Sequence, residues 1–250
     1  MDKIALKKIK DSVCGDFFFY ESVGSTNTEA LRCADARDKS LFLAENQTSG
    51  RGRGNRRWEA GYGGMYMTIL LKPDKITDDI AVLTLMAGLA VSHTIKGALI
   101  KWPNDIILGD KKAAGILAET RISGNTGSIA IGIGVNANNT EFSPEIEKKA
   151  TSIYLYTGKL QNIADLTIKI YGEFFKLYAD FEVGFSKIKE EYCKKCITLN
   201  REIEVIKSGE KTVMQACGIT DKGELLARAD GKTEVINFGD VSVRGLLGYV

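Results

Sequence analysis

Apolar and polar positions change their spacing repeatedly along most of the chain. Short apolar runs have the length of buried strands, and the longer stretches between them have helical spacing. Capping residues from Ser25 onward, followed by the acid Glu29, form a helix start. This alternation predicts a unit built from both strands and helices. The strands are expected over residues 17–23, 41–45, 65–71, 99–102, 106–108, 113–119 and 128–135, and the helices over residues 25–36, 79–95, 163–181 and 185–195.

The pattern changes near Thr198, where short alternating runs begin to follow one another at close spacing. Turn sequences such as Asp221-Lys222-Gly223 and Asp230-Gly231 separate these runs. Regular short strands joined by Asp/Gly turns are typical of a small antiparallel barrel. The chain is therefore expected to carry a β appendage after its larger unit. The runs cover residues 202–207, 212–219, 225–229, 233–237 and 241–244.

Composition narrows the possible chemistry. Hydrophobic residues make up 44% of the 250 residues and charged residues 26%, which is typical of a globular protein. The formal net charge of +2 is far from that of a dedicated nucleic-acid binder. His93 is the single histidine, so a catalytic triad or a histidine-rich metal site would have to use it. Catalysis by Lys, Arg, backbone amides and a bound ion is expected instead.

The N-terminus and the longest apolar stretch favour a cytoplasmic protein. The N-terminus has no apolar core of the length found in signal peptides. The longest apolar stretch, residues 80–95, contains polar residues and is shorter than the roughly 20 residues that a membrane span needs. A buried helix is the better interpretation of this stretch.

The segment from Gly50 to Trp58 is the most informative part of the sequence. It carries four arginines in the order GRGRGNRRW, between two strand-like runs. Its glycines let backbone amides approach an anion closely, and arginine presents a planar fork suited to phosphate or carboxylate. Trp58 adds a flat surface on which a base could stack. The alternative is a flexible RG-type surface loop that binds RNA.

Two further segments offer polar groups at strand ends. The sequence KWPND ends at Asp105, and KKAAGIL follows, with Lys112 at the start of an apolar strand and Gly115 within it. In GIGVN, the glycines Gly132 and Gly134 leave a slot on one face of a strand, and Asn136 can bind an amide or a base edge. Taken singly, each of these segments could be an ordinary packing feature.

In combination, GRGRGNRRW, KWPND, KKAAGIL and GIGVN resemble the biotin protein ligases (biotin–[acetyl-CoA-carboxylase] ligases) over essentially the whole chain. The resemblance implies an α+β fold. A mixed-sheet catalytic domain with flanking helices would cover residues 1–197, and a small C-terminal SH3-like β-barrel would cover residues 198–250. Longer family members begin with a helix-turn-helix DNA-binding domain, for which this sequence has no room. A ligase without repressor function is therefore expected.

The resemblance also assigns residues to biotin. Ser25, Thr26 and Asn27 match the segment at the ureido ring of biotin, and Gln47 matches another biotin contact. The backbone of Gly50 and Arg51 would line the same pocket, and Gly115 and Leu117 would form its wall.

A second group of matches concerns the nucleotide. Lys112 corresponds to the lysine at the reacting carboxylate and α-phosphate, and Arg53 to the arginine that helps retain the adenylate. Trp58 matches the aromatic residue that stacks on adenine. Asn136 matches the residue at the adenine edge, and Arg244 matches an arginine that reaches toward the phosphates. Gly54-Asn55 stands where some members have Arg-Gly, so this loop carries its positive charge differently.

The implied reaction joins biotin and ATP to give biotinyl-5′-adenylate, and then transfers biotin to a lysine of a biotin carboxyl carrier domain. Lys112, Arg51 or Arg53, and a Mg²⁺ ion would supply the opposing charge, with Asp105 as the candidate metal ligand. A homodimer formed through sheet edges is possible. The alternatives are a lipoate–protein ligase and the non-enzymatic RG-type nucleic-acid binder.

Overall fold

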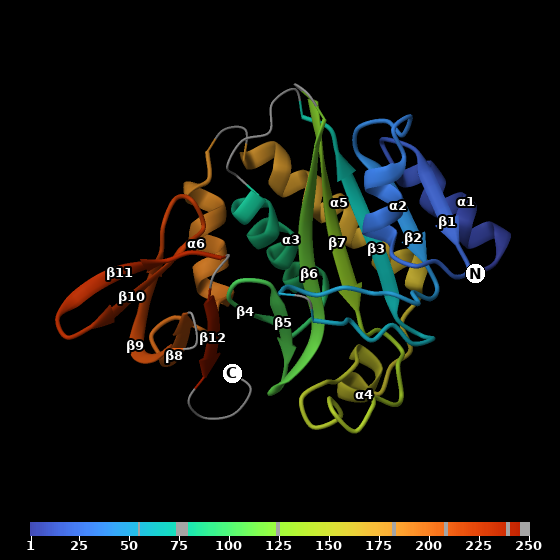
Figure 1. Cartoon of the computed structure of the whole chain (residues 1–250). Helices are drawn as coiled ribbons and strands as arrows, with labels where there is room; N and C mark the ends of the chain where they lie inside the picture. The colour runs from blue at the N-terminus through green and yellow to red at the C-terminus, as the bar shows by residue number, and fades with distance from the viewer. Residues whose placement is uncertain are drawn as a thin grey trace.

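The computed structural model describes residues 1–54, 56–73, 80–123, 126–181, 184–207, 210–238 and 241–245. Its larger part is a seven-stranded mixed sheet in the order β1-β2-β3-β7-β6-β5-β4 (Figure 1). β1 and β2 are parallel, and the remaining neighbours are antiparallel. These strands are β1 (Phe17–Tyr20), β2 (Ser40–Ala44), β3 (Met65–Leu71), β4 (Leu99–Lys101), β5 (Asp105–Leu108), β6 (Lys111–Ser123) and β7 (Thr126–Val135).

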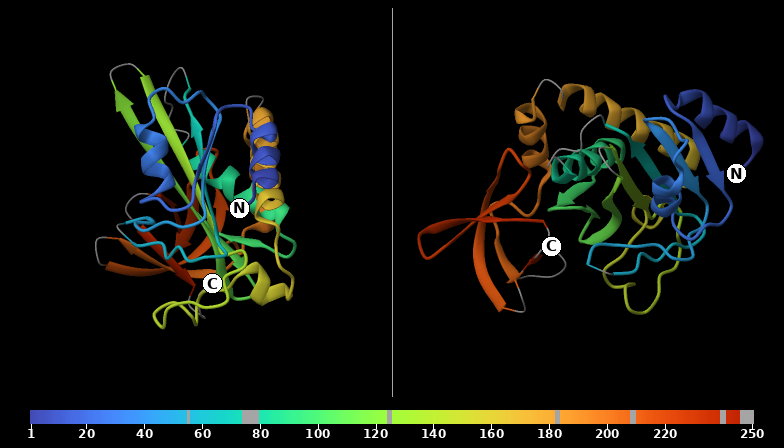
Figure 2. Two further views of the ribbon diagram at one scale, coloured as in Figure 1. Left: turned by 90° about the vertical axis from the view of Figure 1, so that its right-hand side faces the viewer. Right: turned by 45° about the horizontal axis from the view of Figure 1, so that its top comes forward.

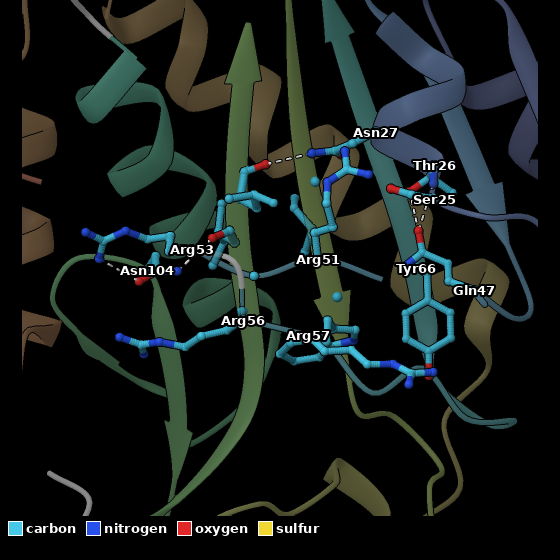
Figure 3. Close-up of a pocket in the computed structure, with 18 of the residues that line it drawn as sticks. Ser25, Thr26, Asn27, Gln47, Arg51, Arg53, Arg56, Arg57, Tyr66 and Asn104 are labelled. Atoms are coloured by element: carbon cyan, nitrogen blue, oxygen red, sulfur yellow. Dashed lines mark hydrogen bonds between the residues drawn. The ribbon is translucent and has the colours of Figure 1, made fainter. Parts of the chain in front are cut away.

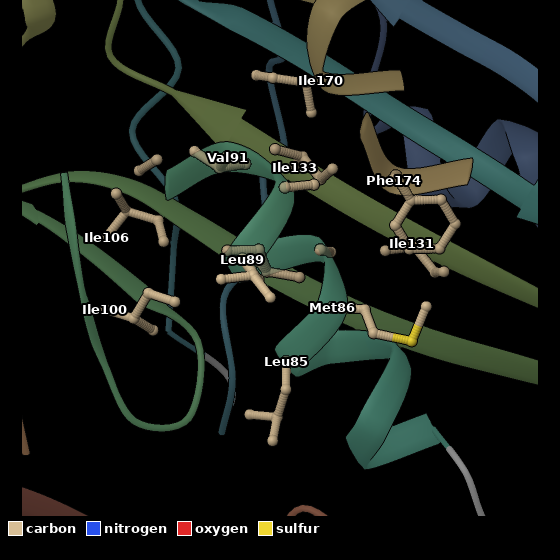
Figure 4. Close-up of a cluster of buried hydrophobic side chains, with 14 of the residues drawn as sticks. Leu85, Met86, Leu89, Val91, Ile100, Ile106, Ile131, Ile133, Ile170 and Phe174 are labelled. Carbon is tan, nitrogen blue, oxygen red and sulfur yellow. The ribbon is translucent and has the colours of Figure 1, made fainter. Parts of the chain in front are cut away.

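One face of the sheet is the main hydrophobic core. Alternate residues of β7, such as Ile131 and Ile133, point to this face and pack against α3 (Ile80–Thr94) (Figure 4). α3 is apolar on all sides and almost wholly buried, because α5 (Ile163–Phe181) and α6 (Ser186–Lys195) cover it. Figure 2 shows α1 (Lys3–Ser12) on the same side as α5.

The opposite face is covered only by the short helix α2 (Thr26–Arg32) and by the arginine loop. A small apolar cluster that includes Ala30, Phe42 and Ala130 holds α2 on the sheet. Gly132 and Gly134 of β7 fall on this face, since side chains alternate along a strand. Because glycine has no side chain and α2 is short, this face of the sheet has space for a site.

The C-terminal part is a five-stranded antiparallel sheet in the order β11-β10-β9-β8-β12. Trp102 joins it to the large sheet: its Nε1 donates to the carbonyl oxygen of Gly223 at 3.0 Å, and its ring lies 5.1 Å from that of Phe238. This five-stranded sheet confirms the β appendage expected from the sequence. Its strands are β8 (Glu202–Lys207), β9 (Glu210–Ile219), β10 (Leu225–Ala229), β11 (Lys232–Ile236) and β12 (Val241–Gly245).

Two helices were not expected from the sequence pattern. α1 is amphipathic and capped by Asp2, although Ile9 is its one fully buried residue, whereas α4 (Ile153–Thr157) is too short to show helical periodicity. The predicted α5 span is confirmed, whereas α2 ends at Arg32, earlier than expected. No helix within the described ranges has the length and apolar character needed to cross a membrane.

Candidate functional site

A cavity opens on the α2 face of the sheet, between β3, β6, β7 and the arginine loop (Figure 3). Ser25 and Gln47 lie at one end of it, and Arg53 and Asn104 at the other. Most of the site residues expected from the sequence line this one cavity. They are Ser25, Thr26, Asn27, Gln47, Arg51, Arg53, Trp58, Asp105, Lys112, Gly115 and Leu117.

A chain of hydrogen bonds forms the floor of the cavity at the α2 end. The Gln47 side-chain oxygen accepts from the backbone N–H of Thr26 at 2.8 Å, so it satisfies a free donor at the start of α2. The hydroxyl of Thr68, wholly buried in β3, lies 2.8 Å from the Thr26 hydroxyl and 2.6 Å from Asn27 Oδ1. The Ser25 side chain makes no cap hydrogen bond and instead faces the cavity. These contacts fix the polar groups of this end.

Three strand glycines create the space for two of the site's side chains. A Cβ on Gly132 would lie 2.4 Å from Asn27 Oδ1, and a Cβ on Gly134 would lie 2.8 Å from the Trp58 ring. At Gly115, the added atom would lie 2.9 Å from the same ring. The slot expected from the GIG sequence is thus confirmed, and the chain's own Asn27 and Trp58 pack into it.

The arginine loop is a tight hairpin. Its arms are joined by a bridge between Arg51 and Arg57, and by a bond from the Trp58 N–H to the Gly50 carbonyl at 3.0 Å. Gly50 is required for close approach, because its Cβ would lie 2.7 Å from the Trp58 carbonyl oxygen. Gly54 near the tip has a φ of +60°, in the left-handed region that favours glycine. Asn55 lies outside the described residues.

Arg53 ties this hairpin to the C-terminal sheet region. Its guanidinium donates to the backbone carbonyl of Phe238, and also to the side-chain oxygen of Asn104 at 3.4 Å. Burial lowers the pKa of the Arg53 guanidinium, and the nearby Asp105 carboxylate opposes this shift. Arg53 is therefore a link between two parts of the chain that lie far apart in sequence.

Lys112 reaches the cavity because of a β-bulge. Asp105 pairs with Gly115 and Ile106 with Ala114, but the register then shifts and Ile107 pairs with Lys112. Residue 113 is the extra residue, and the bulge lets both Ala113 and Ala114 pack on the apolar face. In an unbulged strand of the same length, Lys112 would stand three positions from Gly115 and point to the apolar face, since side chains alternate. Its Nζ instead lies 3.3 Å from where a Cβ on Gly115 would be, on the cavity face.

The charged end of Lys112 is held by two neighbours. Its Nζ lies 2.5 Å from Asp105 Oδ1 and 5.3 Å from the centre of the Trp58 ring. Its backbone N–H donates to the Lys149 carbonyl at 2.8 Å, which fixes the start of the strand. A positioned cation beside an aromatic plate can bind an anionic group joined to a flat ring.

The Trp58 indole carries a further signal. Its Nε1 is buried and has no hydrogen-bond partner among the described residues. Buried donors are nearly always satisfied, so a bound molecule that accepts this bond fits the cavity.

Two predicted site residues lie outside the cavity lining, and a third, Arg244, cannot be compared with it. Gly50 shapes the hairpin from behind, as described above. Asn136 is buried, and its amide nitrogen donates to the Thr151 carbonyl at 3.1 Å, so a nucleotide contact stays a prediction. The side chain of Arg244 lies outside the described residues, although its backbone pairs with Glu204 in β12.

Two residues that hold the site were missed by sequence reasoning. Thr68 is the one polar residue in the apolar strand β3, and this exception was an available signal. Glu119 follows the apolar run of β6 and accepts hydrogen bonds from both Arg51 and Asn27. Arg51 also donates to the Thr28 hydroxyl at 2.8 Å.

The described lining of the cavity contains one carboxylate that could bind a divalent ion, that of Asp105, and it is already paired with Lys112. No cluster of three or more His, Cys, Asp or Glu side chains suited to a metal occurs within the described ranges. Mg²⁺ commonly binds through one or two carboxylates together with phosphate oxygens of a substrate. The donor set therefore fits Mg²⁺ only when phosphate groups share it.

Comparisons with known proteins agree with this arrangement. A sequence profile described as the biotin/lipoate A/B protein ligase family matches residues 19–136, and one described as the biotin protein ligase C terminal domain matches residues 198–244. The bifunctional ligase/repressor BirA of Bacillus spizizenii is 32% identical over 248 residues, covering 94% of this chain and 76% of that protein. The biotin–[acetyl-CoA-carboxylase] ligase of Paracoccus denitrificans is 30% identical over 234 residues, covering 88% and 98%.

Solved structures show the same similarity. The biotin protein ligase from Aquifex aeolicus in complex with biotin and ATP superposes with a TM-score of 0.79 at 28% identity, and the match covers 92% of this chain and 98% of that one.

Proposed function

The chain belongs to the biotin/lipoate A/B protein ligase family, as a biotin protein ligase, and we propose that it makes biotinyl-5′-adenylate and passes the biotinyl group to a lysine of a biotin carboxyl carrier domain. One observation carries this proposal. The cavity joins a fixed polar end at Ser25 and Gln47 to a cationic end where Lys112 lies beside Trp58. A ligand with a ureido ring, a carboxylate and an adenine nucleotide has the groups to match both ends.

In the first step, a carboxylate oxygen of biotin attacks the α-phosphorus of ATP. The bond from this phosphorus to the bridging oxygen breaks, and pyrophosphate leaves with the electron pair. Two anions must meet, so catalysis depends on positioning and on fixed positive charge. Lys112 supplies that charge at the reacting atoms, and its ion pair with Asp105 keeps the ammonium aimed into the cavity.

Asp105, with phosphate oxygens of ATP, would hold a Mg²⁺ ion. Such an ion neutralises charge on the leaving pyrophosphate. Asp105 would then neutralise two cations, Lys112 and the metal.

In the second step, the neutral amine of the carrier lysine attacks the acyl carbon of the adenylate, and AMP leaves. The mixed anhydride is already activated, so no histidine is needed, and His93 instead lies outside the cavity with its Nδ1 2.8 Å from Glu173. We place this chemistry in the cytoplasm, where ATP is available.

The test is incubation with radiolabelled biotin, ATP, Mg²⁺ and a carrier domain, with lipoate in a parallel reaction. Incorporation of biotin on the carrier lysine supports the proposal. Incorporation of lipoate alone would support a lipoate ligase, which the family name leaves open but the match to the biotin ligase C-terminal domain disfavours. Salt-dependent RNA binding without incorporation would favour the nucleic-acid binder.

We expect Trp58→Ala to weaken ATP binding about tenfold while biotin affinity changes less. The reason is loss of the flat surface beside Lys112. The measurement is the KM for each substrate in biotin-dependent ATP–pyrophosphate exchange, with Trp58→Phe as the control that keeps a ring. The reverse pattern, with biotin affected most, would show that the ring is a wall of the biotin pocket.

We expect Arg53→Gly to release adenylate and to biotinylate bystander proteins. This change removes the bonds from the hairpin to Phe238 and Asn104, so the hairpin no longer closes the cavity against water and diffusion. The measurement is labelled biotin on serum albumin added to the reaction. The control is Arg32→Gly, because Arg32 is exposed at the end of α2. Labelling confined to the carrier domain would show that Arg53 does not retain the adenylate.

A further inference from the structure

We propose that Glu119 is a positioning residue for biotin, and that it acts by holding Arg51 and Asn27 at the same time. This inference rests on the proposed function, because it assigns Asn27 and the Arg51 backbone to the biotin end of the cavity. Glu119 lies on the same face of β6 as Gly115 and Leu117, beside that end, but is not itself part of the cavity lining.

The contacts of Glu119 join two elements across β6. Its Oε2 accepts from Arg51 Nη2 at 2.8 Å and from Asn27 Nδ2 at 2.7 Å, and its Oε1 accepts from Arg51 Nε at 3.3 Å. Asn27 belongs to α2 and Arg51 to the hairpin, so one carboxylate fixes the distance between the helix and the loop. The pair with Arg51 is bidentate, the geometry that most restricts a guanidinium.

The remaining polar atoms of both partners are also engaged. Asn27 Oδ1 accepts from the Thr68 hydroxyl at 2.6 Å, and Arg51 Nη1 donates to the Thr28 hydroxyl at 2.8 Å. Arg51 therefore directs its guanidinium at the protein rather than into the cavity. Its charge anchors the hairpin, and its backbone is what remains available to a ligand.

Electrostatics alone would disfavour an acid at this position. The cavity is lined by several arginines and must accept anions, so an unpaired carboxylate nearby would oppose their binding. Glu119 is only 29% exposed, and the guanidinium of Arg51 cancels its charge. The presence of Glu119 therefore needs a structural reason, and its hydrogen bonds to both Asn27 of α2 and Arg51 of the hairpin provide one.

The two explanations predict opposite results for Glu119→Gln. If Glu119 only weakened the positive field, its removal would lower the KM for ATP. If it positions Arg51 and Asn27, the KM for biotin rises about tenfold, because a charged hydrogen-bond network is lost. The kcat of adenylate formation should then stay within about threefold, because Lys112 is untouched. Loss of folded protein would lower the active fraction without raising KM.

The experiment compares wild type, Glu119→Gln, Arg51→Met and the double variant in biotin-dependent pyrophosphate exchange. We expect the double variant to be no worse than the poorer single variant, because both break one interaction. The charge swap Glu119→Arg with Arg51→Glu should recover part of the biotin KM. Glu173→Gln, which changes an ion-paired glutamate on α5, is the matched control and should leave both KM values unchanged.

An unchanged biotin KM in Glu119→Gln, or fully additive effects in the double variant, would overturn the inference. The same four proteins are also compared by thermal unfolding, which needs no substrate. If wild type shows no biotin-dependent exchange, the proposed function fails. The unfolding free energies of the single and double variants still test whether Glu119 holds Arg51. Additive losses of unfolding free energy would reject that contact, independently of the exchange assay.

Discussion

We expect Lys112→Ala to abolish biotin-dependent ATP–pyrophosphate exchange, with a loss of about 10²–10³-fold or more in rate. Lys112 is the cation whose ammonium lies in the cavity beside both Asp105 and Trp58. Its removal leaves the developing negative charge without this fixed partner, and leaves the Asp105 carboxylate to repel the nucleotide.

Lys111→Ala is the matched control, because this neighbouring lysine is exposed and donates to the Glu147 carbonyl away from the cavity. The control should retain exchange, and circular dichroism with thermal unfolding should show both variants folded. Exchange by Lys112→Ala within a few-fold of the control would refute the assignment. Adding Asp105→Asn to the Lys112→Ala variant should not restore exchange, because it also removes the proposed Mg²⁺ ligand.

The second large effect concerns a glycine rather than a charged group. Gly132→Ala should raise the Kd for biotin about 10²-fold, the equivalent of about 3 kcal/mol. The new Cβ would lie 2.4 Å from Asn27 Oδ1, where real atoms cannot remain. Asn27 cannot move aside cheaply, because Thr68, Glu119 and the Leu117 carbonyl hold its amide.

Isothermal titration calorimetry with biotin measures this effect. The control is Gly172→Ala, since a Cβ on that helical glycine meets nothing within 4 Å, and the change should stabilise the protein by up to about 1 kcal/mol. In a Gly132→Ala background, Asn27→Gly should relieve any loss of thermal stability without restoring biotin affinity. Wild-type affinity in Gly132→Ala would mean that Asn27 does not contact biotin.

The strands of the sheet and its buried helices could be predicted because their residues alternate or recur with a clear period. β3 is bounded where the sequence indicates, and α5 spans the expected residues. α1 was missed although its sequence carries local signals: Asp2 accepts from the Ala5 N–H as an N-cap, and Ala5 and Ile9 pack against the core. α4 could not be predicted, because its five residues are too few to show a helical period.

The residues of the site also divide into those that the sequence predicted and those that it did not. Motifs identified the residues that lie in the loop and at strand ends, and most of them meet in one cavity. What the sequence could not reveal is how those residues are held. Glu119 and Thr68 become recognisable only when β6, β3 and α2 are placed side by side. Arg53 likewise reaches a backbone carbonyl at Phe238, a contact that no side-chain pattern encodes.

The bulge in β6 has a consequence for how this segment can change over time. Because the bulge places both Ala113 and Ala114 on the apolar face, the bulge itself returns Lys112 to the cavity face. Loss of residue 113 would give a regular strand that still pairs Lys112 with Ile107, whereas straightening of the bulge at unchanged length would turn the ammonium toward the apolar layer against α3. Two neighbouring small residues that can share the apolar face, rather than a fixed length, are the property that selection must hold constant here.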